Sequence, residues 1–426
     1  MRKVHLISLG CPKNQVDSEK LLSRLSAYDI LYSADPAEAG IIIVNTCGFI
    51  GAAKEESINE ILNAAALKSG PGRKKLVVYG CLAKRYGEEL LREIPEIDAL
   101  WGVAEDEAIA DYCRSILGKR SVSGKADAFH DKPYAYLKIG EGCDRGCSYC
   151  VIPGIRGSYR STEPDQVLSA AEEYLKSGMK ELIVVAQDIT SYGKDLRGYD
   201  LPRLIKEIAA IHGDFRIRLL YLYPTAITDT LLETIASTDN VCNYIDMPLQ
   251  HTEKNILRLM GRGGSRAYFE KMIIRIRQII PDVALRTTVI VGFPQETEDD
   301  FDNMLASIRR MKFDRLGAFT YSKEPGTPAA ALKGQIPKRI RQSRYERLME
   351  AQAPLSLRKN QEIVGRSFRA LVDDTDGGVA IARLCSQAPE IDGVVILKDS
   401  SVAKGDFVKV MITRAGDYDI EGTVIR

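Results

Sequence analysis

The sequence predicts an α/β protein with three parts: an N-terminal domain with a parallel α/β sheet, a central partial (βα)6 barrel, and a small antiparallel β-barrel at the C-terminus. Continuous apolar runs alternate with amphipathic helical patterns as far as residue 360, which is typical of parallel sheets. Short β-branched runs separated by Asp and Gly turns follow. We place the domains at 1–117, 134–360 and 361–426, with a polar linker at 118–133.

The N-terminal domain repeats one strand–helix unit. Apolar strands are expected at residues 6–9, 41–44 and 76–79. The three strands run into Cys11, Cys47 and Cys81, and a helical pattern follows each cysteine. The carboxyl ends of parallel strands share one edge of a sheet, so these cysteines, distant in sequence, are expected at one edge.

The central domain continues the alternation over a longer span. Candidate strands lie at residues 134–139, 181–186, 216–221, 243–247, 284–291 and 316–321. Six such units are too few for a closed eight-stranded barrel, so an open, partial barrel is expected. A charged segment from Pro337 to about Asn360 is predicted to form a long helix that leaves this domain. The terminal barrel is expected to include strands at 368–372, 393–397, 407–412 and 422–425.

Composition places the chain among ordinary globular proteins. Hydrophobic residues make up 45%, charged residues 27%, and the formal net charge is +1. The N-terminal apolar stretch is too short for a signal peptide, and no apolar run is long enough to span a bilayer. We therefore expect a cytoplasmic protein with no membrane partner. In that compartment, spaced cysteines indicate metal binding or catalysis rather than disulfides.

The sharpest motif is a set of three cysteines, Cys143, Cys147 and Cys150, which directly follows the first strand of the central domain. We call this set the central triplet. Its spacing suits three corners of a 4Fe–4S cluster, and the fourth iron can then bind S-adenosylmethionine (SAM) and cleave it reductively. Structural zinc would need a fourth ligand nearby. A redox pair of Cys147 and Cys150 would leave Cys143 unexplained.

Cys11, Cys47 and Cys81 form a second set, here called the dispersed trio. Helix N-termini beside three converging thiolates would favour an anionic cluster. The alternative is three small cysteines packed under loops. Cys113, Cys242 and Cys385 are expected to be structural, and His251 either lines the active site or orients a loop.

The central triplet in a partial barrel resembles the radical SAM superfamily. By this resemblance Tyr149 lies near the SAM adenine, and residues 152–157, with Gly154 and Arg156, match the family's following loop. Residues 288–294 resemble the fifth-strand motif that helps to seat SAM, so the resemblance assigns cofactor binding to Gly292 as well.

Two sets of three cysteines followed by a small β-barrel resemble the radical SAM methylthiotransferases over nearly the whole chain. The resemblance implies an auxiliary 4Fe–4S cluster on the dispersed trio, a SAM-cleaving 4Fe–4S cluster on the central triplet, and a TRAM domain that contacts the substrate. One SAM would methylate a sulfur held on the auxiliary cluster. A second would yield a 5′-deoxyadenosyl radical that abstracts hydrogen from the substrate. An electron donor is also implied.

The family acts either on an aspartate of ribosomal protein uS12 or on a prenylated adenosine of tRNA. Three segments resemble the uS12 branch: residues 10–14, with Pro12-Lys13, residues 45–58 and residues 324–329. The last 66 residues hold eight basic and eleven acidic residues, a poor match to a phosphate backbone and a better one to a basic ribosomal protein. A solvated acidic surface without a partner would give the same count.

We therefore expect transfer of a methylthio group to the β-carbon of a uS12 aspartate, with uS12 or the small ribosomal subunit as partner and tRNA as the disfavoured alternative. The alternative hypothesis from a different functional class is a nonenzymatic iron–sulfur electron carrier or an RNA-binding scaffold. The SAM-binding segments argue against it.

Overall fold

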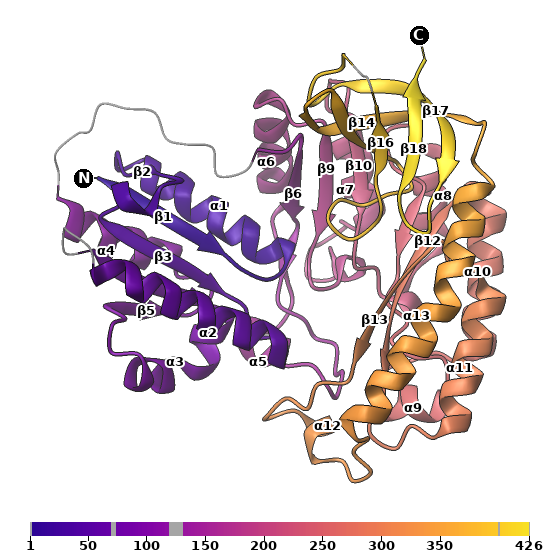
Figure 1. The fold of residues 1–426 in the computed structure, drawn as a ribbon, viewed down its shortest axis with the longest axis horizontal. Helices are drawn as coiled ribbons and strands as arrows, with labels where there is room; N and C mark the ends of the chain where they lie inside the picture. Colours follow the sequence, from indigo (N-terminus) through magenta and orange to yellow (C-terminus); the bar gives the residue numbers. More distant parts are fainter. Residues whose placement is uncertain (1, 70–73, 119–130, 399–400, 426) are drawn as a thin grey trace. The chain divides into compact units, whose positions relative to one another are not determined.

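The computed structural model describes residues 2–69, 74–118, 131–398 and 401–425. Most of the expected linker, residues 119–130, therefore lies outside the described residues. The chain divides into two compact units (Figure 1). The first comprises Met1–Asp131 together with Cys150–Ser158, and the second comprises Lys132–Tyr149 together with Tyr159–Arg426.

The first unit contains a five-stranded, wholly parallel sheet in the order β2-β1-β3-β4-β5. Its strands are β1 (Lys3–Ser8), β2 (Leu31–Tyr32), β3 (Ile41–Thr46), β4 (Lys75–Gly80) and β5 (Ala99–Trp101). The three expected strands form its centre. The two additional strands are edge strands of only two and three residues, too short to give a periodic signal.

Helices cover both faces of this sheet, as expected for βαβ units. They are α1 (Pro12–Ser26), α2 (Gly51–Ala66), α3 (Cys81–Glu93) and α4 (Asp106–Leu117). The unit also contains the short α5 (Ile152–Arg156). Ile41 and Ile43 pack with residues of α1 and α4, whereas Ile42 and Val44 pack with residues of α2 and α3. Burial on both faces explains why the strand reads as a continuous apolar run.

The second unit contains six parallel strands in chain order, as two three-stranded sheets, β6-β9-β10 and β11-β12-β13. These are β6 (Tyr134–Lys138), β9 (Glu181–Val185), β10 (Arg216–Leu219), β11 (Tyr244–Asp246), β12 (Ala284–Val291) and β13 (Arg315–Thr320). A parallel bridge between Ile217 and Val241 joins the two sheets. The open, partial barrel is confirmed. A two-stranded antiparallel sheet of β7 (Gly140–Glu141) and β8 (Arg160–Ser161) was not expected.

The helices of the second unit alternate with these strands. They are α6 (Pro164–Lys176), α7 (Leu201–Ala209), α8 (Asp229–Ser237), α9 (Lys254–Leu259), α10 (Arg266–Ile279), α11 (Glu298–Met311), α12 (Pro328–Ala331) and α13 (Lys338–Gln361). The last is the expected long charged helix. None of the helices in the described ranges combines the length and apolar character needed to cross a bilayer.

The C-terminal residues form a closed barrel in the order β14-β15-β16-β18-β17. Its strands are β14 (Ser367–Asp376), β15 (Val379–Leu384), β16 (Val395–Leu397), β17 (Phe407–Ala415) and β18 (Ile420–Val424). Pairing is antiparallel except between β16 and β18, where the chain crosses over β17 to close the barrel. The small β-barrel is therefore confirmed, with one parallel pair and one strand, β15, beyond the expectation.

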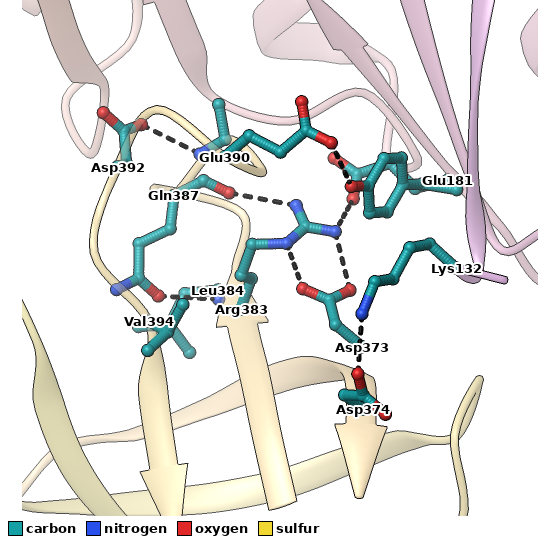
Figure 2. A network of polar contacts seen from close by, with 12 residues as sticks. Lys132, Glu181, Asp373, Asp374, Arg383, Leu384, Gln387, Glu390, Asp392 and Val394 are labelled. Atoms are coloured by element: carbon teal, nitrogen blue, oxygen red, sulfur yellow. Dashed lines mark hydrogen bonds and ion pairs between the residues drawn. The ribbon is translucent and has the colours of Figure 1, made fainter. Parts of the chain in front are cut away.

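The terminal barrel packs against the central barrel where the central strands begin. Glu181 and Arg216 are the first residues of β9 and β10, and both contact Arg383 near the end of β15. Figure 2 shows Arg383 beside Glu181. Glu181 is fully buried and lies 2.7 Å from Arg383 Nη2, which also bonds Asp373 at 2.9 Å. The terminal barrel thus covers the end of the strands opposite to the loops that follow them.

Candidate active site

The dispersed trio lies where three neighbouring strands of the first sheet end. Cys11 follows β1, Cys47 follows β3 and Cys81 follows β4, and β1-β3-β4 are adjacent in the sheet. Cys11 is the N-cap residue of α1, and Cys81 is the first residue of α3. Two of the three thiols therefore sit at helix N-termini, whose free N–H groups favour negative charge.

Glycines beside the cysteines allow these turns to approach closely. Gly10 has φ +91°, and a Cβ atom there would lie 2.6 Å from Cys47 Cβ. A Cβ atom at Gly48 would lie 2.8 Å from Leu82 Cα. Gly80 has φ +103° and packs against the backbone that precedes Cys47. Side chains at these positions would push the strand ends apart.

The protonation of the trio reflects burial and mutual proximity. Burial, with smaller contributions from the neighbouring Cys11 and Cys81, raises the pKa of Cys47 to about 11. Burial also raises the pKa of Cys81, against the opposing effect of Arg156. For Cys11, burial acts in the same direction, but Lys13, nearby N–H groups and Arg156 together lower its pKa. Three neighbouring thiolates need positive charge or a metal to remain ionised.

Arg156 lies at the dispersed trio. Its buried guanidinium has Nη2 3.5 Å from Cys81 Sγ and 2.6 Å from Asn14 Oδ1, while Nη1 lies 3.1 Å from Asp17 Oδ2. Asn14 also donates to the carbonyl of Thr46, next to Cys47. The resemblance assigned Arg156 to SAM binding; in the structure it supplies a cation to the trio.

The central triplet occupies the loop after β7. Cys143 and Cys147 belong to the second unit, and Cys150 begins the segment assigned to the first. The segment after α9 holds this loop in place: the backbone N–H of Ser148 donates to the carbonyl oxygen of Met260 at 2.9 Å. Gly261 has φ +67°, and a Cβ atom there would lie only 2.3 Å from the carbonyl oxygen of Gly146.

Two arginines donate toward the sulfurs of the triplet or brace the loop. Arg262 Nη1 lies 3.6 Å from Cys147 Sγ, and the Arg145 backbone N–H donates to Cys143 Sγ at 3.4 Å. Both guanidinium groups lie over the ring of Tyr223, at 4.4 and 3.8 Å from its centroid. Sequence reasoning missed Arg262 because it is distant from the triplet along the chain and belongs to no local motif.

Two of the residues assigned to SAM binding lie in the same region. Tyr149 packs edge-on to Phe293 at 6.4 Å between ring centroids, and Phe293 directly follows Gly292. Gly292 has φ +72° and its N–H donates to Glu296 Oε2 at 2.8 Å. Gly154 instead lies on α5, in the first unit with Arg156.

His251 is fully buried and accepts the backbone N–H of Glu253 through Nδ1 at 3.0 Å. Burial lowers its pKa to about 3, so it is neutral. This contact orients the loop before α9. Cys113 is packed in the core between α4 and the sheet.

The donor chemistry fits iron–sulfur clusters at both sets. Across the described ranges, no three His, Cys, Asp or Glu side chains meet closely enough to share one metal ion. A cube-shaped cluster places each thiolate on a different iron, so its ligands need not meet at one point. The donors that face Cys81, Cys143 and Cys147 are the kind of hydrogen-bonding partner that cluster sulfurs accept.

Family models match all three parts of the chain. Residues 3–102 match "Uncharacterized protein family UPF0004", residues 137–308 match the radical SAM superfamily, and residues 364–425 match the TRAM domain. Among solved structures, the chain resembles the radical S-adenosylmethionine methyltransferase TsrM from Kitasatospora setae, with TM-score 0.57 and 12% identity over 89% of this chain and 80% of that one. It also resembles the enzyme OxsB, with TM-score 0.52 and 12% identity over 77% and 54%. These likenesses concern the fold.

Relatives of much higher identity extend over the full length. The chain is 49% identical to the ribosomal protein uS12 methylthiotransferase RimO of Thermodesulfovibrio yellowstonii, with 100% of both chains covered. It is 44% identical to the protein of the same name from Carboxydothermus hydrogenoformans, with 99% of both covered. The chain belongs to the family of ribosomal protein uS12 methylthiotransferases named RimO.

Proposed function

We propose that the protein transfers a methylthio group to the β-carbon of an aspartate in ribosomal protein uS12. The observation that carries this proposal is the presence of two separate sets of three cysteines in one chain. Full-length relatives named ribosomal protein uS12 methylthiotransferase support it. Radical chemistry suits this reaction, because the β-carbon of aspartate has an unactivated C–H bond that no side-chain base can usefully deprotonate. Ribosomes place the reaction in the cytoplasm.

In this proposal Cys11, Cys47 and Cys81 hold an auxiliary 4Fe–4S cluster, and the central triplet holds a second 4Fe–4S cluster that also binds SAM. When bound, these groups supply the electron transfer, radical chemistry and sulfur handling that side chains cannot perform. The chain's own residues position them. An electron donor is required in addition.

The surrounding side chains have distinct tasks. Arg262 and the Arg145 N–H hold the sulfurs of Cys147 and Cys143 in place and stabilise their negative charge. Tyr149 offers its ring, braced by Phe293, to an adenine. Arg156 balances thiolate charge at the dispersed trio in a buried environment, where an uncompensated charge would be costly.

The choice of uS12 over tRNA rests on the relatives and on the residues beside Cys11 rather than on the charge of the terminal barrel. Three of its acidic residues contact residues outside the barrel: Asp374 binds Lys132, Glu390 accepts from Tyr136, and Asp392 accepts from Tyr244. A fourth, Asp373, binds Arg383, which in turn contacts Glu181 of the central domain. Much of the acidic excess therefore serves docking within the chain. Pro12-Lys13, in contrast, begins α1 directly beside the trio.

A direct assay separates the two substrates. The reconstituted enzyme, supplied with reductant, sulfide and SAM, should add one methylthio group to a uS12 peptide that contains the target aspartate, as measured by fragmentation mass spectrometry. Peptides with Ala or Glu in place of that aspartate should react poorly, because the target carbon is removed or displaced. Unchanged peptide together with methylthiolated adenosine in tRNA would assign the enzyme to the other branch.

A further inference from the structure

Two cysteines without a role in the proposed reaction meet where the terminal barrel packs on the central domain. Cys242 lies just before β11, and its N–H donates to Ile217 O at 2.8 Å. Cys385 directly follows β15. The side chains of Cys242 and Cys385 interact with each other, although the two residues are 143 positions apart in the sequence.

The two thiols differ in access. Cys242 is buried, whereas Cys385 is exposed. Cys385 lines a cavity of about 420 Å³ at the junction, together with Val241 of the central domain and Phe368 of the terminal barrel. A small reagent can therefore reach Cys385 more readily than Cys242.

The charges around the pair favour a thiolate. Three buried arginines, Arg216, Arg218 and Arg383, surround two carboxylates, those of Glu181 and Asp373, which leaves one positive charge in excess within this group. Figure 2 shows Arg383 between both carboxylates. The buried ion cluster keeps these cations fixed, because separating them would leave unpaired charge.

Cys385 lies close to this excess positive charge. Arg218 Nη1 donates to the Cys385 carbonyl at 2.7 Å, which holds the residue against the cluster. The hydrogen bond from the Cys242 thiol lowers the pKa of Cys385, burial opposes this, and Arg216 and Arg218 lower it further. Burial raises the pKa of Cys242. An exposed cysteine with a lowered pKa beside a buried cysteine with a raised pKa is the arrangement of a reactive and a resolving cysteine.

We propose that Cys242 and Cys385 are a redox-active thiol pair that closes a disulfide between the central domain and the terminal barrel. With a hydroperoxide as oxidant, the Cys385 sulfur attacks the terminal peroxide oxygen, the O–O bond breaks, and an alcohol or water leaves. The Cys242 sulfur then attacks the resulting sulfenic acid and releases water. Two thiols and one hydroperoxide thus give one disulfide, one alcohol and one water. A disulfide oxidant such as glutathione disulfide gives the same bond and two thiols of glutathione.

The test uses the full-length holoenzyme in anaerobic glutathione buffers, because bound iron protects the six cluster cysteines and this oxidant spares the clusters. We expect a disulfide-linked peptide pair containing Cys242 and Cys385, detected by mass spectrometry after alkylation of free thiols. At pH 7, Cys385 should react with iodoacetamide at least ten times faster than the buried Cys113. Cys113→Ser should leave the cross-link unchanged.

Single variants distinguish the two roles. Cys242→Ser should trap glutathione on Cys385, whereas Cys385→Ser should leave Cys242 unmodified. If Cys242→Ser does not fold, the wild type and Cys385→Ser still decide the matter. Absence of the linked peptide at every glutathione ratio, accumulation of a mixed disulfide on Cys385 in the wild type, or alkylation of Cys385 no faster than that of Cys113 would each overturn the proposal.

Discussion

The two sets of cysteines reach their places in opposite ways. The central triplet is local: a single loop carries Cys143, Cys147 and Cys150, and the segment after α9 braces it. The dispersed trio is topological: Cys11, Cys47 and Cys81 come together because three adjacent parallel strands end at one edge. Spacing alone therefore identifies a local site, whereas a dispersed site is recognised only through the fold.

The difference extends to the supporting charges. At the central triplet, Arg262 comes from the segment that follows α9 and touches Cys147. At the dispersed trio, Arg156 comes from α5, directly downstream of the triplet in the chain. One stretch of sequence thus supplies a ligand to one proposed cluster and a cation to the other.

The largest expected effect is on the local set. Cys143→Ala should abolish reductive SAM cleavage, because the proposed cluster loses a ligand from a loop that has no spare thiol. The loss should exceed the roughly 10–100-fold cost of removing an outer partner of a metal ligand. Release of 5′-deoxyadenosine under reducing conditions measures it. Cys113→Ala is the matched control, and SAM cleavage at the wild-type rate by Cys143→Ala would refute the assignment.

The dispersed set should fail differently. Cys11→Ala should retain most SAM cleavage and lose methylthio transfer, because only the proposed auxiliary cluster is disturbed. The same reaction mixture reports both quantities, as 5′-deoxyadenosine and as modified uS12 peptide. If Cys11→Ala loses both activities together, the two sets are not functionally separable.

A smaller effect is expected at Arg156. In a background with the central triplet changed to alanine, Arg156→Met should lower the reduction potential of the remaining cluster by about 60 mV, a tenfold change in a one-electron equilibrium. The loss of a nearby positive charge disfavours the more negative reduced state. Arg156→Lys should restore part of the shift, and the exposed Arg92→Met should cause none. Spectroelectrochemical titration measures the potential. An unchanged reduction potential in Arg156→Met would exclude the proposed role of Arg156 in balancing the charge of the cluster.

The smallest predicted effect is conformational. Gly10→Ala should lower the free energy of unfolding of the first unit by about 2–4 kcal/mol, from a strained φ and the overlap with Cys47. Gly118→Ala has a similar φ of +71° but open space around it, so only about 1 kcal/mol is expected. Trp101, the single tryptophan of the chain, lies in β5 and reports this unit by fluorescence during urea unfolding. Equal losses in the two variants would mean that close approach at Cys47 is unimportant.

Much of the fold could be predicted from the sequence, because the spacing of apolar residues reflects which faces of each helix or strand are buried. The run at residues 41–44 is apolar on both faces of the sheet, and the expected strand at 284–291 matches β12 in full. The short edge strands β2 and β5 and the two-stranded β7–β8 sheet were not predicted, because two or three residues are too few to show a period.

The sites were predictable to a lesser degree because side-chain partners depend on tertiary contacts. Nothing near Arg262 in the sequence indicates Cys147, and Arg156 lies within a SAM-like loop yet contacts Cys81. The charge count of the terminal barrel also misleads, since Asp373 is paired with Arg383, which also contacts Glu181 of the central domain. Counting charges cannot tell an internal docking surface from an external one.

The iron content of two matched variants tests the central claim most directly. Anaerobically reconstituted wild-type protein should bind about eight irons per chain, four in each of two clusters. Replacing all three cysteines of either set by alanine should leave about four, with SAM cleavage kept only when the central triplet is intact. Wild-type iron in the variant that lacks Cys11, Cys47 and Cys81 would contradict the account, because the dispersed trio would then hold no cluster.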